Sequence, residues 1–167
     1  MSYVGRLARE KAEASADRLG PNGDAAIVIA ADTTVDVDGV ILAKPVDIAD
    51  AQRMLGLLSG REHAVHTGVA VRVGRRTEVR VATTRVTMVT IDEARLSWYL
   101  GTREPFGKAG AYALQGAGSA LVDRVDGSVS NVIGLPLTVL DSLLSRFDTS
   151  LIALADAEAS TVVADGA

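Results

Sequence analysis

An uninterrupted apolar run, residues 25–31 (AAIVIAA), constrains the fold more than any other segment of the chain. Its length suits a strand, and a strand without polar alternation is expected to be covered on both faces. The run ends at Asp32, Thr33 and Thr34, so a carboxylate and two hydroxyls follow it. Ligands bind at the carboxyl ends of strands in open α/β sheets. The sequence therefore predicts an α/β protein with polar functional groups at a strand end.

The rest of the chain alternates between helical and strand periodicity. Helices are predicted over residues 3–19, 47–58, 90–100 and 136–147, and strands over residues 35–37, 40–42, 65–73, from 79 onward, 121–125 and 129–133. Asp38-Gly39 predicts a hairpin turn, and Ile48 is expected to face inward. We expect one mixed α/β domain over residues 1–148, followed by a flexible Ala-, Ser- and Asp-rich tail over residues 149–167.

Composition excludes several classes of function. The 167 residues include 17 basic and 21 acidic ones and no cysteine, for a formal net charge of −4. This excludes nucleic-acid binding through bulk positive charge, and it excludes disulfides, thiolate metal sites and cysteine nucleophiles. No signal-peptide core or membrane-length apolar run is present in the sequence, so we expect a cytoplasmic protein without membrane contact.

Two constellations are candidates for chemistry. The first consists of Asp32 and Thr33 with Lys44, which a hairpin would bring back beside them. A carboxylate at this point can bind a cation or accept a proton, and a lysine can neutralise the charge of a phosphate. The alternative is that Asp32 only starts a turn. The second is the glycine-rich stretch from Gly107 through Lys108 to Gln115, which lacks the spacing of a P-loop. The alternative is that this stretch is a plain glycine-rich loop.

The lysines are a further clue. Lys11, Lys44 and Lys108 are the only lysines among the 17 basic residues. Lysine and arginine are not interchangeable at a tight site, so these positions are candidates for a compact ammonium group; chance is the competing explanation. His63 and His66 would point to opposite faces of one strand, which disfavours a metal pair.

Three ordered runs, residues 3–14, 30–71 and 104–137, resemble the Maf family of nucleotide pyrophosphatases. The central run contains AADTTVDVDGVILAKP and the last contains GKAGAYALQG. The resemblance implies the inosine-triphosphate-pyrophosphatase fold, a twisted mixed sheet with flanking helices. It also implies hydrolysis of a nucleoside triphosphate to the monophosphate and pyrophosphate with a divalent cation, Mg²⁺ or Mn²⁺.

By the same resemblance, Asp32 is the expected proton acceptor and a candidate metal ligand. Lys11, Lys44 and Lys108 match the lysines of the family's phosphate-binding cleft, and Thr33 and Gln115 match positions of substrate choice. The sequence around Gln115 resembles that of the branch of the family that acts on dTTP and UTP. The partner expected is therefore a nucleoside triphosphate, and the resemblance also allows a homodimer.

The resemblance has one large departure. Family members begin with a strand and a Ser-x-x-Arg loop upstream of the point that matches Met1. We therefore expect an N-terminally truncated domain with weakened activity. The alternatives are a catalytically impaired nucleotide-binding or regulatory protein of the same fold, linked to septum formation, and a dimerising scaffold without nucleotide affinity.

Overall fold

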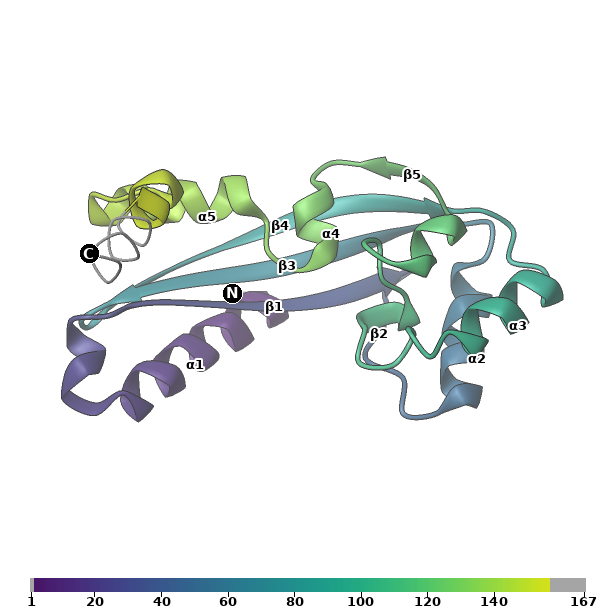
Figure 1. Ribbon diagram of the computed structural model, residues 1–167, viewed down its shortest axis with the longest axis horizontal. Coiled ribbons are helices and arrows are strands. Elements are labelled where there is room, and N and C mark those ends of the chain that lie inside the picture. Colours follow the sequence, from purple (N-terminus) through teal and green to yellow (C-terminus); the bar gives the residue numbers. More distant parts are fainter. Residues whose placement is uncertain (1, 157–167) are drawn as a thin grey trace, which may run out of the picture.

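A twisted antiparallel sheet of five strands, in the order β2-β1-β3-β4-β5, runs through a computed structural model that describes residues 2–156 (Figure 1). The strands are β1 (Ile27–Val37), β2 (Val40–Leu42), β3 (Glu62–Val73), β4 (Arg76–Met88) and β5 (Val122–Asp126). The helices are α1 (Tyr3–Arg18), α2 (Ile48–Leu58), α3 (Glu93–Gly101), α4 (Val129–Ile133) and α5 (Leu137–Leu144). Short 3₁₀ turns cover Gly20–Asp24, Ala109–Ala111, Ala117–Leu121 and Ser145–Phe147. The α/β class is confirmed.

All four pairings in the described sheet are antiparallel, where the resemblance implied a mixed sheet. The physical reason lies partly in the turns, because a short turn can join only antiparallel neighbours. Asp38 and Gly39 both have positive φ, 52° and 81°, as the tight β1–β2 hairpin requires. Gly74, with φ of 58°, makes the β3–β4 turn in the same way.

Asp32 and Thr33 lie inside a strand and not at its end, so that prediction was wrong. β1 continues past them to Val37, and the pairs Asp32↔Gly68 and Thr33↔Thr67 keep it in register with β3. The threonines and valines that follow the apolar run are good strand formers, which explains the longer strand. The expected burial of the run on both faces was also too strong, since Ile29 is 38% exposed.

Helices cover both faces of the sheet because its side chains alternate between them. On one face, Ala8, Ala12 and Ala16 of α1 pack against Val28 and Ala70. On the other, Leu140, Leu143 and Leu144 pack against Val69 and Val71. Figure 1 shows α1 and α5 on opposite sides of the long strands, with α2 and α3 beyond their far end.

Residues 129–133, predicted as a strand, form the short helix α4. Ser128 caps it by accepting a hydrogen bond from the Asn131 amide at 3.2 Å. Gly127 and Gly134, with φ of 130° and 121°, bound the helix on either side. The buried Asn131 side chain then donates to Val65 O and to Thr84 Oγ1, both at 3.0 Å, which ties α4 to β3 and β4.

Smaller differences concern helix ends. α3 begins at Glu93 and is capped by Asp92, two residues later than the box at Thr90 predicted. Ile48 is 60% exposed and does not face inward. Residues 151–156 of the expected tail are helical, and Leu151 and Leu154 pack against the α5 cluster. Residues 157–167 of that tail lie outside the described residues.

Candidate functional site

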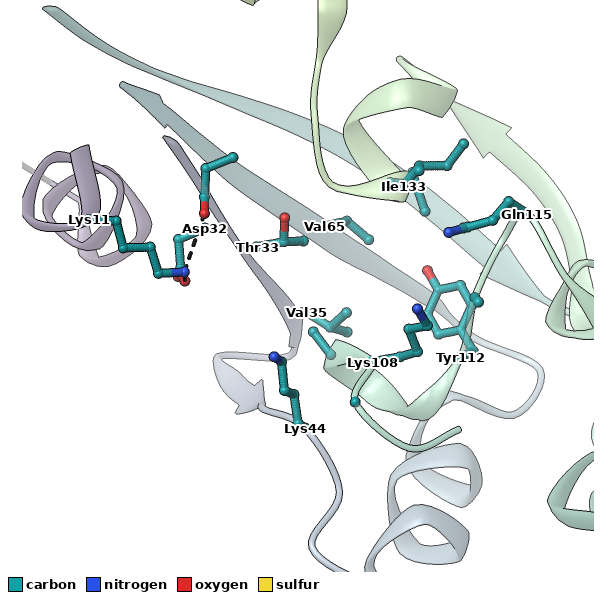
Figure 2. Close-up of a pocket in the computed structure, with 15 residues that line it drawn as sticks. Lys11, Asp32, Thr33, Val35, Lys44, Val65, Lys108, Tyr112, Gln115 and Ile133 are labelled. Carbon is teal, nitrogen blue, oxygen red and sulfur yellow. Dashed lines mark hydrogen bonds and ion pairs between the residues drawn. The ribbon is translucent and has the colours of Figure 1, made fainter. Parts of the chain in front are cut away.

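A cavity of about 280 Å³ opens beside β1, next to a stretch whose outer side has no partner strand among residues 2–156. β2 pairs with β1 only from Val35 to Val37, so residues 31–34 form a free strand edge within the described chain. Side chains from both faces of β1 reach this edge. Six residues predicted from the sequence line the cavity: Lys11, Asp32, Thr33, Lys44, Lys108 and Gln115 (Figure 2).

Asp32 and Lys11 form an ion pair at one end of the cavity. Lys11 Nζ lies 2.6 Å from Asp32 Oδ1 and also donates to Ala31 O at 3.3 Å. The Asp32 side chain is 17% exposed and the Lys11 side chain 54% exposed. α1 delivers Lys11 because its small residues Ala8 and Ala12 bring this helix close to the sheet. The pair therefore joins helix and sheet while leaving one carboxylate oxygen without a protein donor among residues 2–156.

Lys44 and Lys108 enter the cavity from two loops that are tied together. The Gly110 amide donates to Ala43 O at 3.1 Å, which fixes the segment before Lys44 against the segment after Lys108. Gly110 has φ of 69°, and a Cβ there would lie 2.9 Å from the Val35 side chain. Within residues 2–156, neither lysine ammonium has a hydrogen-bond or ion-pair partner, so both are available to an anion.

Glu104, which sequence reasoning missed, supports the loop that carries Lys108. Its carboxylate accepts hydrogen bonds from the amides of Ala117 and Gly118, both at 2.8 Å, and from the Tyr99 hydroxyl at 3.0 Å. Burial pushes the pKa of Glu104 upward, but these hydrogen bonds and the Lys108 charge outweigh it and hold the pKa below its ordinary value. A lone Glu in a loop gave no sequence signal for this role.

The far end of the cavity is less charged. Gln115, Ile133 and Tyr112 lie together there, away from Lys11 and Asp32, with Lys108 beside Tyr112 (Figure 2). Tyr112 is a second residue that the sequence did not single out. Its hydroxyl contacts Nε2 of the buried His63 at 2.8 Å. His66 points to the opposite face of β3 and contacts Thr83, so the two histidines lie apart as predicted.

Thr33 is oriented by a chain of hydrogen bonds. Thr67 Oγ1 donates to Asn131 O at 3.0 Å and lies 2.9 Å from Thr33 Oγ1. Because the Thr67 proton goes to Asn131, Thr33 must donate to Thr67. The Thr33 oxygen then faces the cavity as an acceptor.

The cavity offers one carboxylate to a metal ion. Asp32 is the only acidic residue among the described residues that line it. Residues 2–156 contain no group of three or more His, Cys, Asp or Glu side chains placed to hold a metal. Mg²⁺ commonly takes one or two carboxylates together with water and substrate phosphates. Asp32 fits a divalent cation that is shared with a bound polyphosphate.

Fold and site together define an α/β protein whose antiparallel sheet carries a lysine-lined cleft for a phosphorylated ligand. A family model described as Maf-like protein matches residues 1–147. The chain belongs to the Maf family. In the part that the structure describes, no helix combines the length and apolar character needed to cross a membrane.

Curated relatives carry one functional name. The dTTP/UTP pyrophosphatase of Myxococcus xanthus is 52% identical over 145 residues, which cover 87% of this chain and 71% of the relative. That of Anaeromyxobacter dehalogenans is 48% identical over 149 residues, covering 86% and 72%. That of Bordetella parapertussis is 48% identical over 143 residues, covering 85% and 69%. None of these three names refers to septum formation.

Proposed function

We propose that this protein hydrolyses dTTP and UTP to the nucleoside monophosphate and pyrophosphate. The observation that carries the proposal is the convergence of Lys11, Asp32, Lys44 and Lys108 on one cavity whose other end holds Gln115. Three cations match the charge of a triphosphate, and a carboxylate beside them matches a hydrolytic reaction. The names of the relatives support the same substrates. We place the reaction in the cytoplasm because nucleoside triphosphates are found there.

The reaction is an attack of water on the α-phosphorus. The water oxygen forms a bond to that phosphorus, the bond from the α-phosphorus to the bridging oxygen breaks, and pyrophosphate leaves with the bond electrons. Asp32 accepts the proton of the attacking water, in keeping with the carboxylate oxygen that has no donor within residues 2–156. Lys44 and Lys108 stabilise the negative charge on the departing pyrophosphate. A divalent cation, Mg²⁺ or Mn²⁺, supplies further charge neutralisation when bound.

Lys11 keeps Asp32 ready for this step. An ammonium group 2.6 Å from the carboxylate holds that side chain in place and fixes the direction of its second oxygen. The same ammonium is exposed enough to contact a phosphate while it remains paired. Lys11 thus links the base to the bound anion.

Substrate choice is proposed to lie at the other end of the cavity. The Gln115 amide offers a donor and an acceptor, which suits the edge of a thymine or uracil ring. Thr33 adds an acceptor oxygen, because its own proton is committed to Thr67. Ile133 provides an apolar wall for the ring.

A panel of substrates tests the proposal. Pyrophosphate release is measured from dTTP, UTP, CTP and GTP with Mg²⁺ or Mn²⁺, and we expect release from dTTP and UTP to exceed the others. Lys108→Met should reduce kcat/KM for dTTP by at least about tenfold, because a hydrogen bond to a charged group is lost. Arg75→Met, which removes one exposed charge at the β3–β4 turn, is the matched control and should change nothing. Equal rates on all four nucleotides, or no release by the folded protein, would contradict the proposal.

A further inference from the structure

His63 and Tyr112 form a buried pair behind the wall of the cavity. His63 is 3% exposed and Tyr112 5% exposed, and the two rings meet edge to face with centroids 5.5 Å apart. Tyr112 Oη lies 2.8 Å from His63 Nε2, whereas His63 Nδ1 is buried without a hydrogen-bond partner among the described residues. Only Tyr112 of this pair lines the cavity.

The unpaired Nδ1 indicates which atom donates. Burial lowers the pKa of His63 to about 4, so the ring is neutral at physiological pH and carries one N–H. If Nδ1 carried the ring proton, a buried N–H would have no acceptor among the described residues. If Nε2 carries it, the only unsatisfied atom of the ring is the lone pair of Nδ1. Buried N–H groups without an acceptor are the rarer defect. Nε2–H therefore donates to Tyr112 Oη.

This arrangement leaves the Tyr112 proton free. The hydroxyl already accepts from His63, and it makes no other hydrogen bond within residues 2–156. Figure 2 shows the hydroxyl end of Tyr112 pointing toward the space between Thr33, Val65 and Ile133. Burial raises the pKa of Tyr112, so the hydroxyl stays protonated. The cavity wall thus presents the neutral Tyr112 hydroxyl as a donor, and the hydrogen bond that it accepts from His63 fixes its position.

We propose that Tyr112 donates a hydrogen bond to the nucleoside part of the bound nucleotide, and that His63 is a positioning residue that acts through Tyr112. The inference rests on the proposed function. Lys108 lies beside Tyr112, but the nucleoside is favoured over the phosphates because Tyr112 also groups with Gln115 and Ile133, whereas the Lys11–Asp32 pair lies at the other end (Figure 2). A base carbonyl or sugar oxygen suits a neutral donor, and the lysines provide for the phosphates.

Tyr112→Phe tests the contact without changing the ring. We expect KM for dTTP to rise by about fivefold to tenfold with kcat within about twofold, the size of one neutral hydrogen bond. Inhibition by inorganic pyrophosphate, which has no nucleoside, should be unchanged. Tyr3→Phe makes the same chemical change on an exposed ring of α1 and serves as the control. Equal weakening of pyrophosphate and dTTP, or no change in either, would overturn the inference.

His63 is tested through Tyr112. His63→Met removes the donor and should raise KM for dTTP as Tyr112→Phe does, while the double variant should be no worse than Tyr112→Phe alone. His63→Gln keeps an N–H near the Nε2 position and should restore most of the affinity, so the test survives if His63→Met fails to fold. Effects of the two single variants that add in the double variant would show that His63 does not act through Tyr112.

Binding of dTMP, measured by calorimetry, separates this inference from the proposed function. If the wild-type protein does not hydrolyse dTTP or UTP, the proposed function fails while dTMP still probes the pocket. Weaker dTMP binding by Tyr112→Phe than by wild type then supports the contact. Equal binding by both, or no binding by either, overturns it.

Discussion

Asp32 lies in the middle of β1, where the outer edge of this strand has no partner strand within residues 2–156. One of its carboxylate oxygens accepts a hydrogen bond from Lys11, and the other is directed to the cavity. The sequence singled it out as a candidate because a carboxylate follows an apolar run. Its exact setting was not predictable, since nothing local indicates where the pairing of β2 with β1 stops.

Asp32→Asn should reduce turnover of dTTP by at least about 100-fold, because an amide cannot accept the proton of the attacking water. The free energy of unfolding should change by less than about 1 kcal/mol, since the lost ion pair is partly exposed. Steady-state kinetics and urea unfolding measure the two quantities. Asp123→Asn, on exposed β5, is the control. Full activity in Asp32→Asn would remove Asp32 from the proposed role.

His63 should make the protein less stable in mild acid. An unfolded chain protonates this histidine below its ordinary pKa of 6.5, whereas the folded chain does so only near pH 4. The unfolded state therefore binds more protons between these values, and stability falls as pH falls through that window, by about 3 kcal/mol in total.

The measurement is urea unfolding from pH 7 to pH 4 for wild type and His63→Gln. Carboxylates with a lowered pKa, such as Glu78 beside Arg146 and Arg76, also make the folded protein less stable as they are protonated in acid. Only the difference between the two proteins therefore reports on His63. The variant should show the shallower loss. Parallel curves would mean that burial of His63 does not shift its proton equilibrium.

At the scale of elements, the approach of α1 to β3 determines where Lys11 lies. Gly68 faces the first turn of α1, and a Cβ there would come within 2.3 Å of Val4 O and 2.7 Å of Gly5 N. Gly68→Ala should therefore push the helix away, lowering the free energy of unfolding by more than about 2 kcal/mol and weakening the Lys11–Asp32 pair.

Gly56→Ala is the matched control, because nothing lies within 4 Å of a Cβ added there on α2. Alanine in a helix should stabilise this variant by about 0.5–1 kcal/mol. Urea unfolding and dTTP turnover measure both variants. Wild-type stability in Gly68→Ala would show that α1 tolerates displacement.

Elements with clear local signals were predictable. The hairpin at Asp38-Gly39 and the helix capped by Asp47 match the structure closely. α4 was not predictable because Val129, Val132 and Ile133 suit a strand, whereas the helix depends on the Ser128 cap and on hydrogen bonds from Asn131 to distant strands. Strand length was underestimated for β1 because pairing with β3, not composition, extends it.

At the scale of the whole molecule, the apolar cluster under α5 and the candidate site lie at different places along the sheet. The Leu140, Leu143 and Leu144 cluster lies on α5, and Figure 1 shows α5 at the end of the sheet away from α2 and α3. The candidate cavity was foreseeable as a set of residues from the family motifs. Its shape depends on contacts such as those of Glu104 and Gly110, which join segments that are distant in sequence.

Removal of residues 149–167 should lower stability without changing catalysis. It deletes the packing of Leu151 and Leu154 on the α5 cluster, with an expected cost of about 2 kcal/mol. None of residues 149–156, the described part of the deleted segment, lines the cavity, so kcat/KM for dTTP should be unchanged well below the melting temperature. Thermal unfolding and steady-state kinetics check both parts. Unchanged stability would mean that these leucines contribute no net packing energy.

Hydrolysis of dTTP in ¹⁸O-labelled water, with Mg²⁺ present, tests the proposed reaction most directly. Attack at the α-phosphorus predicts that one ¹⁸O atom enters dTMP and that the released pyrophosphate is unlabelled. Mass spectrometry of the two products distinguishes this from attack at the β-phosphorus, which would label pyrophosphate instead. Labelled dTMP from wild type, absent with Asp32→Asn, is the expected result. Labelled pyrophosphate, or formation of dTDP and orthophosphate, would contradict the proposed reaction.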